Sequence, residues 1–196
     1  MKRTLRKTIV YPHPIDRVWR ALTHRDALAQ WLMPNDFEPV VGHQFQFRTD
    51  PAPGFDGVVH CRVLDLDEPR LLRISWRGGP VDTVVTWRLE HAGDGRTRLE
   101  FEHAGFDGLR AILVSFILGS GWPRMYEKFL PEVLEQLARG ALDPGASLRC
   151  RAQGSASPVK ANLIARLARV LPDRMGRARR TTAVKPTDRP SERKTP

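Results

Sequence analysis

The chain has 196 residues, of which 41% are hydrophobic, so it can form one domain with an appendage or at most two small domains. No apolar run approaches the roughly 20 residues of a membrane-spanning helix, and no apolar signal core follows the basic residues 1–7. The two cysteines, Cys61 and Cys150, lie in segments of different character, which argues against a disulfide. We therefore expect a cytoplasmic protein.

The net charge of +10 belongs to the C-terminal part of the chain. Residues 146–196 contain 13 Lys and Arg against 3 Asp and Glu, whereas residues 1–145 contain 19 of each sign. The end of the chain is rich in Arg, Thr and Pro, a composition typical of disorder. The sequence predicts a domain over residues 1–143 and a basic, mostly disordered extension over residues 144–196, in which one amphipathic stretch, 159–171, can form a short helix.

Three interpretations of this extension remain open. It can bind nucleic acid through phosphate contacts, its amphipathic stretch can rest on an anionic membrane surface, or it is a solvated extension without a partner. Deleting residues 146–196 and repeating salt-titrated DNA-binding and liposome-binding assays distinguishes the three.

The first elements are a strand over residues 3–10 and two short helices. Pro14 suits the first position of a helix, because its missing N–H has no partner there. The run Thr23 to Asp26 resembles a capping box that starts the second helix, and Pro34 ends it. The apolar stripe of the first helix, with spacing i, i+3, i+4 and i+7, consists of Ile15, Val18, Trp19 and Leu22.

Five further strands are predicted, separated by residues typical of turns. They lie around Phe45 and Phe47 and over residues 58–66, 71–77, 83–90 and 97–103. Their alternation predicts an antiparallel sheet with one dry face and one wet face. The dry face collects Phe45, Phe47, Val59, Cys61, Val63, Leu72, Ile74, Trp76, Val85, Trp87, Leu89, Leu99, Phe101 and His103.

The helical period returns after Phe106. Residues 109–118 predict a short apolar helix, Gly119-Ser120-Gly121 a hinge, and residues 122–138 the longest helix. Pro131 is expected to kink or break this last helix, because proline cannot donate the backbone hydrogen bond.

Several motifs in this order are similar to a known family. They are Pro14-x-x-Arg17-Val18-Trp19-x-Ala21-Leu22-Thr23, Trp31-Leu32-x-Pro34, Gly42-x-x-Phe45 and His103-x-Gly105-Phe106, followed by Gly121-Trp122. Over residues 3–140 the sequence resembles the Hsp90-ATPase-activator-homologue-like family, part of the START-related SRPBCC superfamily. The resemblance implies an α+β helix-grip fold: a curved antiparallel sheet of about six strands around a long C-terminal helix.

The resemblance also implies a cavity between sheet and helix that holds a small apolar or aromatic molecule. The same side chains can equally be ordinary core, where large aromatics are common. His103 is either a group that hydrogen-bonds the ligand or a satisfied core histidine. The predicted ligand-binding residues are Trp31, Phe47, Trp76, Trp87, Phe101, His103, Trp122, Met125 and Phe129.

Two other functions stay open on the same resemblance, a co-chaperone-like or regulatory interaction protein and a cyclase-like or hydrolase-like enzyme that uses the same cavity. No residue is assigned a catalytic role, because no serine lies in a G-x-S-x-G context and Cys61 is predicted to be buried. No metal or other cofactor is expected, because the histidines and cysteines lack spacings such as C-x-x-C.

Overall fold

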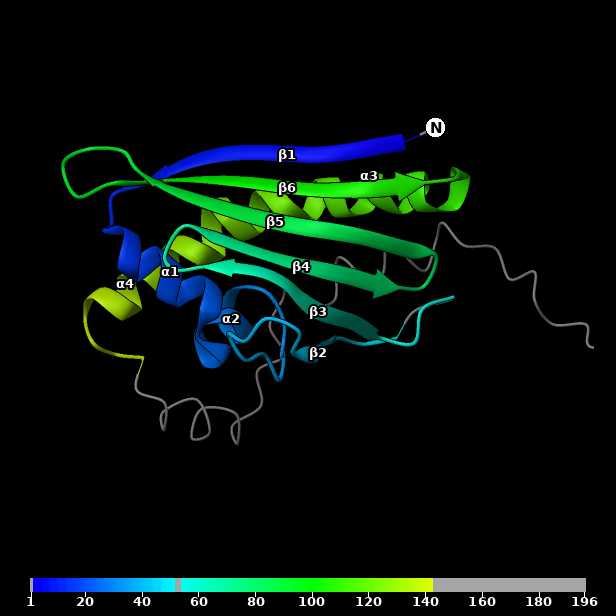
Figure 1. Cartoon of the computed structure of the whole chain (residues 1–196), viewed down its shortest axis with the longest axis horizontal. Helices are drawn as coiled ribbons and strands as arrows, with labels where there is room; N and C mark the ends of the chain where they lie inside the picture. The colour runs from blue at the N-terminus through cyan, green and yellow to red at the C-terminus, as the bar shows by residue number, and fades with distance from the viewer. Residues whose placement is uncertain (1, 52–53, 143–196) are drawn as a thin grey trace, which may run out of the picture.

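The computed structural model describes residues 2–51 and 54–142. Six strands form one antiparallel sheet in the order β1-β6-β5-β4-β3-β2 (Figure 1). The first strand therefore pairs with the last one. The strands are β1 (Lys2–Tyr11), β2 (Gln44–Arg48), β3 (Val58–Asp67), β4 (Leu71–Gly78), β5 (Val81–His91) and β6 (Thr97–Asp107).

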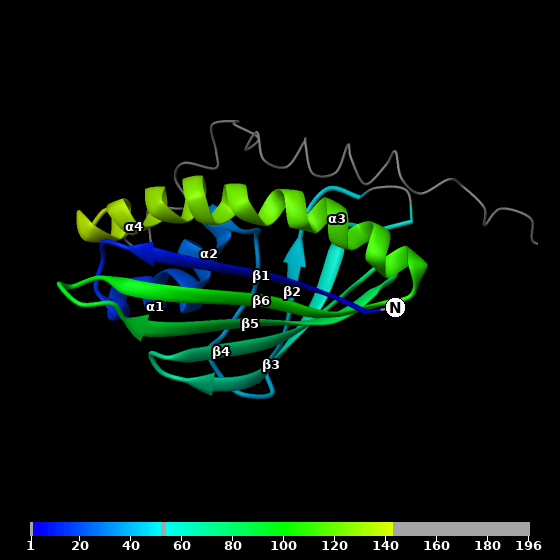
Figure 2. The same ribbon diagram turned by 90° about the horizontal axis from the view of Figure 1, so that it is seen from above.

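Helices cover one face of this sheet (Figure 2). A rod of α3 (Leu109–Arg124), the π-helical η1 (Met125–Phe129) and α4 (Leu130–Ala138) runs along it. The short α1 (Ile15–Thr23) packs against α4 and β5, and α2 (Arg25–Trp31) packs against α4 and η1. This arrangement confirms the predicted α+β helix-grip fold, with a curved sheet around a long C-terminal helix.

The two faces of the sheet follow the alternation in the sequence. On β4, Ile74 and Trp76 are buried while Arg73 and Arg77 are exposed, as the period of two requires. The last strand is longer than predicted: it continues past His103 to Asp107, because the start of β1 pairs with that end. The dry face of the sheet and the covering helices share one hydrophobic core.

The predicted hinge at Gly119-Ser120-Gly121 is wrong, because α3 continues through it. A Cβ added at Gly119 would lie 3.4 Å from a methyl group of Leu5 on β1. That separation is an ordinary van der Waals distance, so a residue with a Cβ would also fit there. The packing of α3 against the edge strand β1 offsets the low helix propensity of glycine.

Pro131 does disturb the regular α-helical hydrogen bonding, but it does not break the rod. The five residues of η1 directly precede α4, in which Pro131 occupies the first turn. The Leu130 N–H donates to the Met125 carbonyl, five residues back. Such π-helical turns are rare and appear as single insertions in α-helices.

The predicted capping box before α2 is not formed. His24 is the residue that caps α2, and its side chain makes no capping hydrogen bond. The Thr23 hydroxyl donates instead to the Trp19 carbonyl at 2.9 Å, within α1. The side chain that would cap α2 is therefore engaged by the preceding helix.

The predicted basic extension, its amphipathic stretch and Cys150 lie outside the described residues. Within residues 2–51 and 54–142, Cys61 is buried and is not part of a disulfide. None of the helices in this described part is both long and apolar enough to cross a membrane.

Candidate ligand-binding site

Four rings meet between the sheet and α3. Trp76 comes from β4, Phe101 and His103 from β6, and Trp122 from α3. The centroid of the Trp122 ring lies 4.6 Å from that of Phe101, 5.8 Å from that of Trp76 and 5.9 Å from that of His103. These separations fall in the range in which aromatic rings attract one another. We call Trp76, Phe101, His103 and Trp122 the four-ring cluster.

Tyr126 on η1 extends this cluster. Its ring stacks on Trp122 at 5.6 Å and lies 5.0 Å from Phe101. Trp31 approaches it at 5.6 Å, and Trp87 donates its indole N–H to the Tyr126 hydroxyl at 2.7 Å. Burial raises the pKa of Tyr126 well above its usual value, so this hydroxyl stays protonated.

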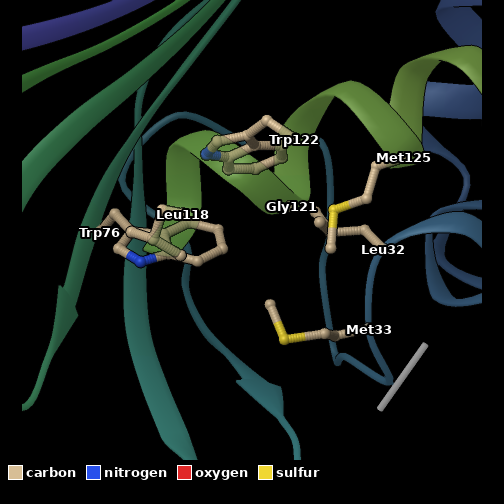
Figure 3. A pocket seen from close by; sticks show the side chains of 7 residues that line it. All are labelled: Leu32, Met33, Trp76, Leu118, Gly121, Trp122 and Met125. Atoms are coloured by element: carbon tan, nitrogen blue, oxygen red, sulfur yellow. The ribbon is translucent and has the colours of Figure 1, made fainter. Parts of the chain in front are cut away.

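A small apolar cavity of about 20 Å³ adjoins the cluster. Figure 3 shows Trp76 and Trp122 on one side of it, with Met33 and Met125 reaching toward it from opposite sides. A cavity of this size holds about one water molecule. The seven residues that line it are Leu32, Met33, Trp76, Leu118, Gly121, Trp122 and Met125.

Three of the nine predicted site residues therefore line the cavity, namely Trp76, Trp122 and Met125. The prediction missed the other four, Leu32, Met33, Leu118 and Gly121. Of these, Leu118 and Gly121 precede Trp122 and Met125 by four residues each. On a helix that spacing places side chains on one face, so the helical period alone could have found them.

The other six predicted residues lie around the cavity without lining it. Phe47, at 5.4 Å from Trp76, continues the aromatic packing, as Trp31, Trp87 and Phe101 do. Phe129 is half-buried, and the guanidinium of Arg124 lies 5.5 Å from its centroid. Phe129 is thus the one predicted aromatic residue for which no contact with these rings is seen within the described part of the chain.

His103 is fully buried and is held by Thr83 on β5. The His103 Nε2 lies 2.8 Å from the Thr83 hydroxyl oxygen, which also lies 3.1 Å from the Trp76 carbonyl. Burial lowers the pKa of His103 to about 3, so the imidazole is neutral at physiological pH. The other ring nitrogen, Nδ1, has no hydrogen-bond partner among the described residues.

Metal-ligating side chains and the thiol of Cys61 bear on the chemistry open to this region. No group of three His, Cys, Asp or Glu side chains in residues 2–51 and 54–142 could hold a metal ion. The Cys61 thiol is buried, and this burial, with a smaller effect of Asp36, raises the pKa of the thiol. Cys61 is therefore a poor nucleophile, because the thiolate is the reactive form.

The six-stranded sheet curves around the C-terminal helical rod, and aromatic side chains fill the space between them. This arrangement defines the chain as a helix-grip protein of the START-related type. Residues 12–135 match the family described as "Activator of Hsp90 ATPase homolog 1-like protein", and the chain belongs to this family. A comparison with curated proteins gives no match. Membership supports a ligand-binding or co-chaperone-like protein.

Solved structures agree with this assignment. The protein MLL2253 from Mesorhizobium loti is 34% identical, with a TM-score of 0.58 over 68% of this chain and 98% of that one. CalU16 from Micromonospora echinospora is 24% identical, with a TM-score of 0.54; the match covers 84% of this chain and 98% of CalU16. The Aha1 dimer from Colwellia psychrerythraea is 19% identical, with a TM-score of 0.55 over 68% and 96%. The last two share the fold.

Proposed function

We propose that the chain binds a small apolar or aromatic molecule between the sheet and the C-terminal helix. The observation that carries the proposal is the apolar cavity beside Trp76 and Trp122. Its lining is apolar except for the indole nitrogens, and aromatic rings surround it. Sites for small molecules are typically apolar and aromatic, with few polar groups.

Binding requires the cavity to open. A volume of about 20 Å³ is far below the several hundred Å³ of typical ligand sites. Met33 and Leu118 are only half-buried, so they can move with little loss of core packing. Methionine is unbranched and adapts its shape easily, which suits Met33 and Met125 to admitting a ligand.

The first test is native mass spectrometry of gently purified protein, in which a bound small molecule is expected as added mass. The second is titration with the neutral apolar dye Nile red. Replacing Met33 by Ala shortens a half-buried side chain that lines the cavity, so we expect several-fold tighter dye binding. The matched control is Leu137→Ala, because Leu137 is also half-buried but lies on α4 away from the cavity.

Absence of added mass, together with no dye binding by either the natural protein or the Met33→Ala variant, overturns the proposal. Equal dye binding by both variants and the natural protein also contradicts it, since the dye then binds elsewhere. A cytoplasmic location remains a prediction from the sequence.

A second function, that of an interaction protein, is favoured by one exposed surface. Leu109, Leu113 and Phe116 are 76%, 41% and 59% exposed and lie at spacing i, i+4 and i+7 on α3. Exposed apolar side chains in one row are typical of protein-protein contacts. The dimeric state named for the Aha1 structure from Colwellia psychrerythraea supports a second copy of the chain as the partner. We call Leu109, Leu113 and Phe116 the α3 stripe.

A further inference from the structure

Two buried nitrogens of the four-ring cluster lack hydrogen-bond partners among the described residues. They are the His103 Nδ1 and the Trp122 Nε1. His103 is 0% exposed and Trp122 is 4% exposed. A buried polar atom without a partner is costly and uncommon in folded proteins, so each of the two requires an explanation.

The hydrogen bonds of Thr83 determine which of these nitrogens accepts and which donates. A hydroxyl has one proton, and the Trp76 carbonyl can only accept, so the Thr83 hydroxyl donates to that carbonyl. The His103 Nε2 must then carry its own proton and donate to the Thr83 oxygen. In a neutral imidazole the other nitrogen is an acceptor, so Nδ1 presents a lone pair.

The Trp122 indole nitrogen has the opposite character, because it is only a donor. The cluster therefore presents one free acceptor and one free donor on adjacent rings, whose centroids are 5.9 Å apart. Both rings also contact Phe101 and Trp76. Trp122 and Trp76 in turn line the apolar cavity, and His103 contacts both of these rings without lining the cavity itself. A molecule that enlarges the cavity past these two rings would reach the two nitrogens.

A hydroxyl group satisfies both nitrogens with one oxygen atom. It donates its proton to the His103 Nδ1 and accepts the Trp122 N–H through its oxygen. An ether or a ketone only accepts and leaves the histidine unpaired. An ammonium only donates, and burying any charge among these rings is strongly unfavourable.

We propose that the ligand is a neutral apolar molecule with a hydroxyl group, such as a phenol, whose hydroxyl bridges His103 and Trp122. This inference rests on the proposed ligand-binding function and names the chemical class of its ligand. An aromatic body is favoured because the rings of Trp76, Phe101 and Trp122 offer stacking surfaces.

The test uses three probes of similar shape: 2-naphthol, its methyl ether and 2-methylnaphthalene. Their affinities for the full chain are measured by calorimetry. The naphthol is expected to bind at least about tenfold more tightly than the methylnaphthalene, since one buried hydrogen bond accounts for about that factor. The ether is expected between them, because it accepts from Trp122 but cannot donate to His103.

Two variants assign the preference to the two nitrogens. Trp122→Phe removes the donor and keeps a ring, so the advantage of the ether over the methylnaphthalene is expected to disappear. The double variant Thr83→Val with His103→Leu removes the acceptor and its hydrogen-bonded partner together, so the naphthol is expected to bind no better than the ether. If this double variant fails to fold, the Trp122→Phe variant and the three probes still decide the outcome.

The possible results separate the two proposals. Binding of all three probes with equal affinity overturns this inference alone and leaves an apolar ligand site. Binding of none overturns the proposed function and, with it, this inference. A naphthol preference that neither variant reduces overturns the assignment to His103 and Trp122.

Discussion

The Tyr11 hydroxyl donates to the backbone carbonyl of Tyr126 at 2.8 Å, which joins the end of β1 to the π-helical turn. In that turn the Leu130 N–H donates to the carbonyl of Met125. The same five-residue spacing would direct the next N–H, that of residue 131, to the Tyr126 carbonyl. Pro131 has no N–H, so the Tyr11 hydroxyl supplies the missing donor.

Replacing Tyr11 by Phe is therefore expected to leave this carbonyl without its side-chain donor. The free energy of unfolding should fall by about 1–3 kcal/mol, the usual cost of an unsatisfied buried polar group. Urea denaturation measures the change.

The control repeats the Tyr11→Phe substitution in a protein that already carries Pro131→Ala, which restores an N–H at position 131. In that background Tyr11→Phe is expected to cost less, with a coupling of about 0.5 kcal/mol or more in the double-mutant cycle. Equal costs of Tyr11→Phe in both backgrounds would contradict the link between Tyr11 and Pro131.

Thr83 is expected to be as important for stability as the histidine that it holds. Thr83→Val removes the hydroxyl that bonds both His103 and the Trp76 carbonyl, and should lower the free energy of unfolding by about 1–3 kcal/mol. Thr83→Ser keeps the hydroxyl and is expected to cost clearly less. If Thr83→Ser costs as much as Thr83→Val in urea denaturation, the hydroxyl contributes no more to stability than the methyl group, and the prediction is wrong.

The stability of the protein should decrease in mild acid because of His103. Its pKa is about 3 in the folded chain against 6.5 for an ordinary histidine, owing to burial. Between these values the unfolded chain binds the proton and the folded chain does not. The contribution of His103 is therefore complete above pH 6.5 and is lost as the pH falls toward 3. One group of this kind removes about 2 kcal/mol by pH 5.

His103→Gln provides the comparison, because its amide can donate to Thr83 from a similar position without titrating. Other groups also respond to acid: burial, and to a smaller degree Arg17, lowers the pKa of His13, while Glu135 raises it. The difference between the natural protein and the variant isolates His103. The same slope of unfolding free energy against pH in both proteins would show that His103 does not carry the effect.

Charges on the α3 stripe should affect association and leave the fold intact. The double variant Leu109→Glu with Phe116→Glu is expected to reduce self-association in analytical ultracentrifugation and to change stability by roughly 0.5 kcal/mol per site or less. Val41→Glu is the matched control, since Val41 is 58% exposed but lies before β2. A natural protein that is monomeric at all concentrations, or variants that all associate equally, would rule out the α3 stripe as the contact.

The sequence predicted the sheet well because the pattern behind it is local. Side chains alternate across a strand whatever the strand pairs with, so the burial of Ile74, Trp76, Trp87 and Phe101 follows from the order of residues alone. The family motifs extended this local pattern to a fold. The two helices between β1 and β2 were likewise predicted from local signals: an apolar stripe, two prolines and a capping box, of which the capping box is not formed.

Contacts between distant segments decided the rest. Gly119 lies within α3, where this helix packs against β1 beside Leu5. The π-helical turn at Pro131 has its partner in Tyr11, more than 100 residues away. Leu5 and Tyr11 are far from these positions in the sequence, so the residues around Gly119 and Pro131 do not reveal them. For this reason the sequence predicted a hinge at Gly119, where the helix continues, and a kink or break at Pro131, where the rod contains a π-helical turn.

The sequence by itself thus determined which residues face the interior, since that depends on the period of each element. Only the tertiary structure decided what those residues do there. Strand register sets Thr83 opposite Trp76 and beside His103, and the helix brings Trp122 over them. The cavity and the two unpartnered nitrogens arise from this packing, because the distance between side chains on different elements depends on how those elements meet.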